Sequence, residues 1–257
     1  MLTDIQNRKD NRNIAIDRVG IKGFTCPIVL KDKSKGTQNT VAKINMSVML
    51  PHEFKGTHMS RFLEVLNRHK NNISNMAVSD ILEEMRTVLD SNESHIEMTF
   101  PYFIEKEAPV SKIPSLMDYE CCFAGTCDSN GKDFVLTVKV PIQSLCPCSK
   151  EISDRGAHNQ RSIASISVRF NKVVWIEELI AIAESSGSSP IYSLLKRTDE
   201  KFVTEQAYDN PAFVEDIVRN IAEKLNADDR ITWYEISCEN MESIHNHNAW
   251  AMISKTK

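Results

Sequence analysis

The chain has 257 residues, of which 41% are hydrophobic and 26% are charged, as is ordinary for a globular protein. Its formal net charge of -4 argues against a dedicated nucleic-acid-binding protein, which would usually be basic. No apolar run is long enough to cross a bilayer, and the polar residues 1–10 cannot form the apolar part of a secretory signal, so we expect a cytoplasmic protein without a membrane partner.

The first half of the chain predicts strands and helices around one core. Residues up to about Lys35 show little periodicity and predict an extended arm. Strands are predicted where apolar and polar residues alternate, at 42–50, 96–104, 117–127 and 133–141. Helices are predicted from apolar residues at helical spacing, near 62–66 and 81–89. The pair Asn130-Gly131 is a favoured hairpin turn.

The second half repeats this order of elements after a middle loop at residues 143–160. We expect strands at 164–170, 231–239 and 248–253 and helices at 174–184 and 211–226. Asn210 is expected to cap the last helix, with Pro211 at its first position. The pattern predicts an α+β protein of two modules with antiparallel sheets.

The densest chemical signal is the segment Cys146-Pro147-Cys148-Ser149-Lys150, followed by His158. Thiolate and imidazole are zinc-type ligands, and a cysteine and a histidine twelve residues apart could meet across a loop. We expect one cysteine to bind a metal and the other to face substrate, with Lys150 favouring a nearby thiolate. Two structural cysteines in a turn are the alternative.

The chain has seven cysteines, an odd number, and reduced thiols are expected.

A second motif, Glu242-Ser243-Ile244-His245-Asn246-His247, places a carboxylate and two imidazoles within six residues. In a strand, His245 and His247 would point to one face, because side chains repeat every two residues. Such a set suits metal binding or acid–base chemistry. The alternative is a solvated edge with incidental histidines.

Three further features are weaker. Glu200 and Glu215 could each be ordinary surface carboxylates, and Glu215 stands in the first turn of a predicted helix, where the helix dipole favours a negative charge. The segment from Lys55 to Arg61 leads into a helix with two cations and free backbone donors, which is a plausible phosphate site. No glycine-rich phosphate loop or dinucleotide motif is present.

Taken together, these segments resemble the GTP cyclohydrolase type IB family, a family of the tunnelling fold. The matching segments run from the arm to the C-terminal part, so the resemblance covers essentially the whole chain. They are Asp4-Ile5-Gln6-Asn7, Lys55-Gly56-Thr57-His58-Met59-Ser60-Arg61, Leu145-Cys146-Pro147-Cys148-Ser149-Lys150, Gly156-Ala157-His158-Asn159-Gln160-Arg161 and Ser243-Ile244-His245-Asn246-His247-Asn248.

The resemblance implies an α+β chain of tandem tunnelling-fold modules, each an antiparallel sheet with a pair of helices on one face. Residues 1–145 would hold the N-terminal arm and the first module, and residues 146–257 the active-site loop and the second. It also implies a homo-oligomer, expected to be a tetramer. The implied reaction converts GTP and water to 7,8-dihydroneopterin triphosphate and formate, the entry to folate and a route to deazaguanine-modified tRNA. One divalent metal per active site is required, with zinc, manganese and iron all plausible.

By position, the resemblance also assigns roles to single residues. The metal ligands would be Cys146, His158, Glu200 and Glu242. Cys148 would be the catalytic cysteine beside C8 of the purine, and Glu215 would bind the guanine edge, since a carboxylate can accept two parallel hydrogen bonds. The acid–base or phosphate-side groups would be His245 and His247, and the triphosphate ligands would be Lys55 and Arg61.

The implied mechanism begins with attack on C8 by a water that the metal makes acidic, with Cys148 transferring a proton or holding the C8 adduct. Ring opening, release of formate and closure of the pterin ring would follow.

Two alternative functions stay open. A nitrile reductase of the same fold would use a cysteine and a nicotinamide cofactor without a catalytic metal. A non-catalytic zinc-stabilised binding module would close a four-ligand metal site.

Overall fold

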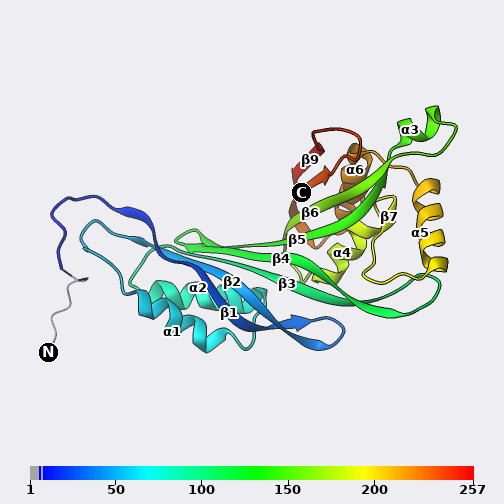
Figure 1. Cartoon of the computed structure of the whole chain (residues 1–257). Coiled ribbons are helices and arrows are strands. Elements are labelled where there is room, and N and C mark those ends of the chain that lie inside the picture. The colour runs from blue at the N-terminus through cyan, green and yellow to red at the C-terminus, as the bar shows by residue number, and fades with distance from the viewer. Residues whose placement is uncertain (1–5, 7) are drawn as a thin grey trace. The chain divides into compact units, whose positions relative to one another are not determined.

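The structure is a computed structural model that describes residue 6 and residues 8–257 (Figure 1). The chain divides into two compact units. Unit 1 comprises residues 1–101 and 122–136, and unit 2 comprises residues 102–121 and 137–257. The chain passes between the units within three long strands, β3 (Ser94–Glu107), β4 (Pro114–Asp128) and β5 (Gly131–Leu145). The predicted modules, residues 1–145 and residues 146–257, are consecutive stretches of sequence, and the boundary between them stays a prediction.

Unit 1 is an antiparallel sheet with two helices on one face. Strand β1 (Ile16–Asp32) pairs with β2 (Gly36–Leu50), and β2 pairs with β3. The helices α1 (Met59–His69) and α2 (Asn75–Val88) lie side by side against the sheet (Figure 1). Alternate residues of β2 are buried under them, which is the physical basis of the alternation seen in the sequence.

The prediction of an arm up to Lys35 is wrong for residues 16–32, which form β1. The pairing of β1 with β2 shifts register between Ile16 and Val19 and again between Ile21 and Phe24. These irregularities disrupt the two-residue period, and regular alternation of burial is confined to residues 26–32. The first half of this strand therefore carries no periodic signal in the sequence.

Unit 2 is built on strands β6 (Asn159–Phe170), β8 (Ile231–Asn240) and β9 (Ala249–Thr256), which pair in that order and antiparallel. The short β7 (Ser189–Pro190) pairs with β5. The remaining elements of the unit are the helices α3 (Pro147–Ile152), α4 (Ile176–Glu184), α5 (Arg197–Asp209) and α6 (Val214–Ala227). Helices α4 and α6 supply most of the apolar helical surface of the core.

Two helical predictions in unit 2 need correction. Helix α6 begins at Val214 with Phe213 as its N-cap, and the Asp216 carboxylate accepts from the Phe213 N–H at 3.0 Å. Asn210 is instead the C-cap of α5, a helix that the sequence did not predict. Only Asp199 and Ala207 of α5 are buried, so this helix has no apolar stripe to detect.

The antiparallel α+β architecture agrees with the predicted fold class. Among residue 6 and residues 8–257, no helix is both long enough and apolar enough to cross a membrane.

Asp199 fastens the start of α5 to the turn between β3 and β4. Its side chain is fully buried, and the carboxylate accepts four hydrogen bonds of 2.7–2.8 Å, from the Val110 N–H, the Ser111 N–H and hydroxyl, and the Lys196 N–H. Burial alone would raise the pKa of Asp199, but these hydrogen bonds outweigh it and hold the pKa well below its usual range. The carboxylate is therefore charged at neutral pH and stabilises the fold.

Asp199→Ala is expected to lower Tm by roughly 5–10 °C at pH 7, because buried backbone N–H groups lose their acceptor. A depressed folded-state pKa gives stability that is complete above the ordinary aspartate pKa of about 3.9 and is lost as pH falls through the folded value. The Tm difference between the variant and the wild type should therefore shrink below about pH 4. Thermal unfolding followed by circular dichroism measures both effects.

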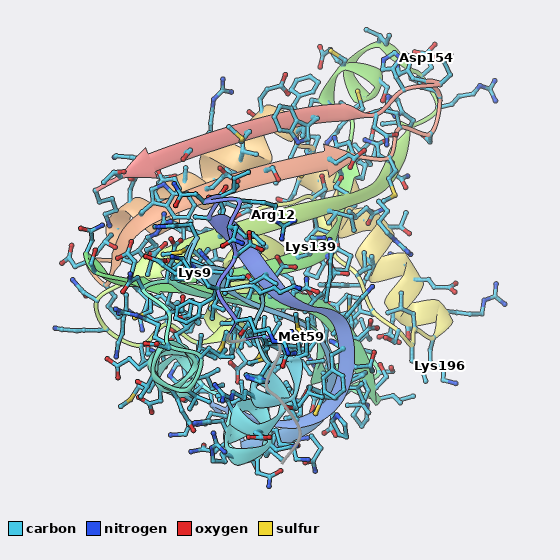
Figure 2. All side chains as sticks on the ribbon, turned by 90° about the vertical axis from the view of Figure 1, so that its left-hand side faces the viewer. Lys9, Arg12, Met59, Lys139, Asp154 and Lys196 are labelled. Atoms are coloured by element: carbon cyan, nitrogen blue, oxygen red, sulfur yellow. The ribbon has the colours of Figure 1, made fainter. Side chains whose placement is uncertain are left out.

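The matched control is Asp154→Ala, since Asp154 is exposed on the connection after α3 (Figure 2). It should leave Tm within about 1–2 °C of the wild type. Equal losses in the two variants would contradict the role assigned to Asp199.

Candidate functional site

The cysteine motif lies where β5 ends and α3 begins. Cys146 is the N-cap of α3, and its Sγ accepts from the Ser149 N–H at 3.4 Å, with Pro147 at the first helical position. Cys146 is half-buried, whereas Cys148 is exposed. The local geometry therefore separates the two thiols, one turned into the cap and one open to solvent.

The loop after α3 returns His158 to Cys146. The Cys146 N–H donates to the His158 carbonyl at 3.0 Å, and the His158 N–H donates to the Ser149 hydroxyl at 3.2 Å. These contacts close the loop between the cysteine and the histidine, which are twelve positions apart. The imidazole Nδ1 lies 3.0 Å from the Gln160 Oε1 and 3.9 Å from the Glu242 Oε2. His158 is thus fastened to Cys146 through the backbone, and its imidazole lies near the Glu242 carboxylate of the second motif.

The histidines of the second motif do not lie on a strand, so the argument that a strand would point both to one face does not apply. Residues 241–248 form the connection between β8 and β9. Its one large aliphatic residue, Ile244, is 64% exposed, so the segment has no buried face that would favour a strand. The rings of His245 and His247 nevertheless stack, with centroids 5.1 Å apart and planes at 19°, and both side chains are exposed.

The two predicted carboxylates of the helices are both exposed. Glu200 lies in the first turn of α5, and Glu215 lies in the first turn of α6, as expected. The Lys150 ammonium group donates to the Tyr208 carbonyl at the end of α5 and lies 4.3 Å from the centre of the Tyr208 ring. The structure therefore offers no support for the expectation that Lys150 favours a cysteine thiolate.

The predicted phosphate segment belongs to unit 1 and is held by the start of the chain. The Lys55 N–H donates to the Arg8 carbonyl at 3.0 Å, and the Gly56 N–H donates to the Gln6 carbonyl at 3.1 Å. Asp4, Ile5 and Asn7 of the first matching segment lie outside the described residues.

The two cations of this segment differ in their surroundings. The Lys55 side chain is exposed. The Arg61 Nη1 donates to the Val88 carbonyl at the end of α2 at 3.0 Å, so this guanidinium already has a structural partner. Lys55 is therefore the freer of the two candidates.

The proposed ligands in unit 2 are of the types that bind a transition-metal ion, but they do not form a complete metal site in this structure. Thiolate, imidazole and carboxylate are the usual zinc ligands, and His158 and Glu242 approach within 3.9 Å. Among the residues that the structure describes, no three His, Cys, Asp or Glu side chains gather closely enough to hold a metal. A complete site would need movement of these side chains or a further donor.

A cavity of about 660 Å³ borders this motif in unit 2, within the size range of small-molecule sites. Its walls are the end of β5, residues 155–157 and 159, and the second half of α5. The cavity therefore adjoins the residues on both sides of His158.

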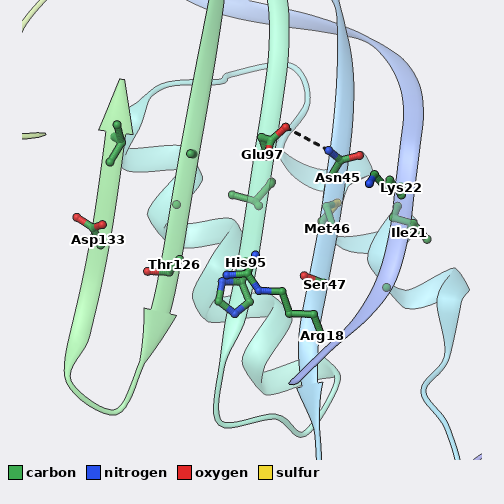
Figure 3. A pocket seen from close by; sticks show the side chains of 15 residues that line it. Arg18, Ile21, Lys22, Asn45, Met46, Ser47, His95, Glu97, Thr126 and Asp133 are labelled. Atoms are coloured by element: carbon green, nitrogen blue, oxygen red, sulfur yellow. Dashed lines mark hydrogen bonds between the residues drawn. The ribbon is translucent and has the colours of Figure 1, made fainter. Parts of the chain in front are cut away.

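Another cavity, of about 550 Å³, lies in unit 1 over strands β1 to β5 (Figure 3). Two cations and two carboxylates line it, Arg18, Lys22, Glu97 and Asp133. His95, also in its wall, has a lowered pKa because of burial and the nearby Arg18. None of the predicted site residues lines this cavity, and its balanced charges indicate no particular class of ligand.

Buried polar residues next to His158 were not predicted from the sequence. Gln160, Ser144 and Asn240 are at most 7% exposed, although all three are polar. Their burial could have been predicted from the sequence, because each occupies one of the alternate positions of its strand that otherwise hold buried apolar residues. A polar side chain at such a position needs a hydrogen-bond partner.

The chain is similar to known proteins over nearly its whole length. Residues 2–251 match the family model described as type I GTP cyclohydrolase folE2. The GTP cyclohydrolase FolE2 of Syntrophotalea carbinolica is 58% identical over 252 residues, which cover 98% of this chain and 94% of that protein. The GTP cyclohydrolase FolE2 of Syntrophus aciditrophicus is 57% identical over 254 residues, which cover 99% and 100%.

Solved structures with a similar fold are much more distant in sequence. The uricase of Arthrobacter globiformis has a TM-score of 0.55 and 7% identity, covering 94% of this chain and 93% of its own. The urate oxidase of Bacillus subtilis has a TM-score of 0.54 and 8% identity, covering 93% and 98%. These likenesses concern the fold alone and confirm the predicted tunnelling fold.

Proposed function

Because the chain belongs to the FolE2-type family of GTP cyclohydrolases, we infer that it converts GTP and one water to 7,8-dihydroneopterin triphosphate and formate. The family likeness spans nearly the whole chain, so it covers both units. The observation that carries the inference to a site is that His158 is hydrogen-bonded to the backbone of Cys146, two residues before the exposed Cys148, and lies 3.9 Å from Glu242. This reaction opens folate synthesis.

The proposed metal ligands are Cys146, His158, Glu242 and Glu200. The first three fit a divalent ion by donor type. His158 is linked to Cys146 through the backbone and lies near Glu242, on the Nδ1 side of its ring. Glu200 is the least supported, because it is exposed on α5 and no described contact links it to the others. When bound, the ion supplies Lewis acidity and lowers the pKa of water. Zinc, manganese and iron are all compatible with this mixed donor set.

The remaining proposed roles belong to groups that touch substrate. Cys148 is exposed at the first turn of α3 and is suited to exchanging a proton at C8 of the purine. The exposed Glu215 carboxylate can accept two N–H groups of the guanine edge. The stacked imidazoles of His245 and His247 can move protons while the ribose opens. Lys55 and Arg61 are proposed for the triphosphate, whose charge needs cations.

We also propose that the chain works as a homo-oligomer, a tetramer in our expectation. Strands β1 and β9 end the strand order, and among the described residues neither pairs with a further strand on its outer side. Open strand edges favour pairing with another chain.

The test of the function is incubation of the protein with GTP after loading with zinc, manganese or iron in turn. A fluorescent pterin after oxidation and an equal amount of formate are expected with at least one metal. No product with any of the three would overturn the proposal. A parallel assay follows NADPH oxidation with a deazaguanine nitrile, and turnover there alone would favour the nitrile reductase.

A further inference from the structure

A chain of buried polar groups extends from His158 into the core of unit 2. It connects three neighbouring strands, with Ser144 on β5, Gln160 and Ser162 on β6, and Asn240 on β8. These four side chains are only 0–7% exposed. Burying so many polar groups costs free energy unless each is hydrogen-bonded. Each group should therefore have a partner, and this requirement restricts which groups donate and which accept.

The Ser144 hydroxyl determines which groups donate and which accept in this series of buried hydrogen bonds. Its Oγ lies 2.9 Å from the Ala212 carbonyl, which can only accept, so the single hydroxyl hydrogen is used there. Ser144 must therefore accept from its other two neighbours. These are the Gln160 Nε2 at 3.4 Å and the Asn240 Nδ2 at 3.2 Å.

This direction fixes the orientation of both amides. With its NH₂ group on Ser144, Gln160 turns its Oε1 to His158, 3.0 Å from Nδ1. Asn240 likewise turns its Oδ1 to the Ser162 hydroxyl, which donates at 2.6 Å. Reversing either amide would set its carbonyl oxygen against the Ser144 oxygen, whose only hydrogen is donated to the Ala212 carbonyl, so neither group could donate.

The same logic determines the tautomer of His158. An amide oxygen only accepts, so Nδ1 of the neutral imidazole must carry the hydrogen. The Glu242 Oε2 lies 3.9 Å from the same nitrogen, which is beyond hydrogen-bonding distance, so Gln160 is the nearer acceptor. The lone pair of the ring is then left on Nε2.

We infer that Gln160, held in place by Ser144 and Asn240, is a positioning residue that keeps His158 as the Nδ1–H tautomer and presents Nε2 as its metal-binding nitrogen. The metal part of this inference rests on the proposed function, whereas the tautomer does not. Acceptors on the far nitrogen of a metal-binding imidazole orient the ring and raise its basicity. The hydrogen bonds to Asn240 also fasten the strand end that leads to Glu242, two residues further on.

The direct test is magic-angle-spinning ¹⁵N NMR of the full, metal-free protein labelled with [¹⁵N]histidine, at a pH where His158 is neutral. The spectrum of His158→Gln identifies the signals of His158. The inference expects a protonated Nδ1 and an unprotonated Nε2. A protonated Nε2 would overturn it, whether or not the protein binds metal.

Two variants test the effect on the metal. Gln160→Met keeps the side-chain length but removes the acceptor, and it should weaken zinc binding about 10–100-fold in competition with a chromophoric chelator. Gln160→Glu keeps an acceptor for Nδ1–H and should bind zinc at least as tightly as the wild type. The matched control is Gln38→Met in the β1–β2 hairpin of unit 1, which should not change zinc affinity.

The outcomes separate this inference from the proposed function. Wild-type affinity in Gln160→Met, or equal losses in Gln160→Met and Gln160→Glu, would overturn the positioning role. If the wild type binds no metal, the proposed metal site fails, while the NMR result still decides the tautomer. Should Gln160→Met not fold, as thermal unfolding would reveal, the wild-type spectrum remains decisive.

Discussion

Cys148→Ala is expected to lower kcat for pterin formation by about 10²–10⁴-fold, the range for loss of a group that transfers a proton in the reaction. The reason is positional. Cys148 is exposed, and among the described residues no hydrogen bond holds its thiol, whereas the Cys146 thiol caps α3. Fluorescence of the oxidised pterin and release of formate measure the loss.

The variant should fold and bind metal as the wild type does, because an exposed side chain away from structural contacts contributes little to stability. Cys122→Ala is the matched control, since Cys122 is a half-buried thiol on β4, outside the two motifs. Normal turnover in Cys148→Ala would remove the proposed catalytic role of this cysteine. Loss of turnover together with loss of metal would instead assign Cys148 to the metal.

Removing the metal with a chelator is expected to abolish GTP turnover and to leave the protein folded. The core of each unit is apolar and is closed without the proposed ligands, since Ile44 and Phe62 in unit 1 and Ile166 and Ile221 in unit 2 are fully buried. Cys146, His158 and Glu242 are instead at strand ends and connections. Circular dichroism and the metal content measured by mass spectrometry follow fold and metal together.

The size of the change in stability distinguishes an enzyme from a zinc-stabilised binding module. A bound ion stabilises the folded state by about 3–4 kcal/mol when present at 100–1,000 times its Kd. A structural zinc contributes about 10–16 kcal/mol, and its removal unfolds the domain. Unfolding on chelation would therefore favour the binding module. Recovery of turnover when zinc, manganese or iron is returned is the expected control.

The elements with a regular apolar period could be predicted from the sequence, and those without one could not. The apolar residues of strand β2 and of helices α1 and α2 recur toward one core. The predicted segments 42–50, 62–66 and 81–89 overlap these elements, although β2 and α2 each begin six residues earlier. Helix α5 was missed because it is anchored by one buried carboxylate, Asp199, and not by an apolar face. The start of β1 was missed because irregular pairing with β2 removes the two-residue period.

The sequence by itself determined the family, the reaction class and the two motifs that carry Cys146, Cys148, His158 and Glu242, because residue types and their order are sufficient for recognition. Only the tertiary structure decided which of these residues meet and how they are held. Ser144, Gln160 and Asn240 are up to 96 residues apart in the chain, and they are partners because β5, β6 and β8 are neighbours in one sheet. A buried polar group acquires its role from the partner that folding brings to it, and that partner cannot be read from its own segment of the chain.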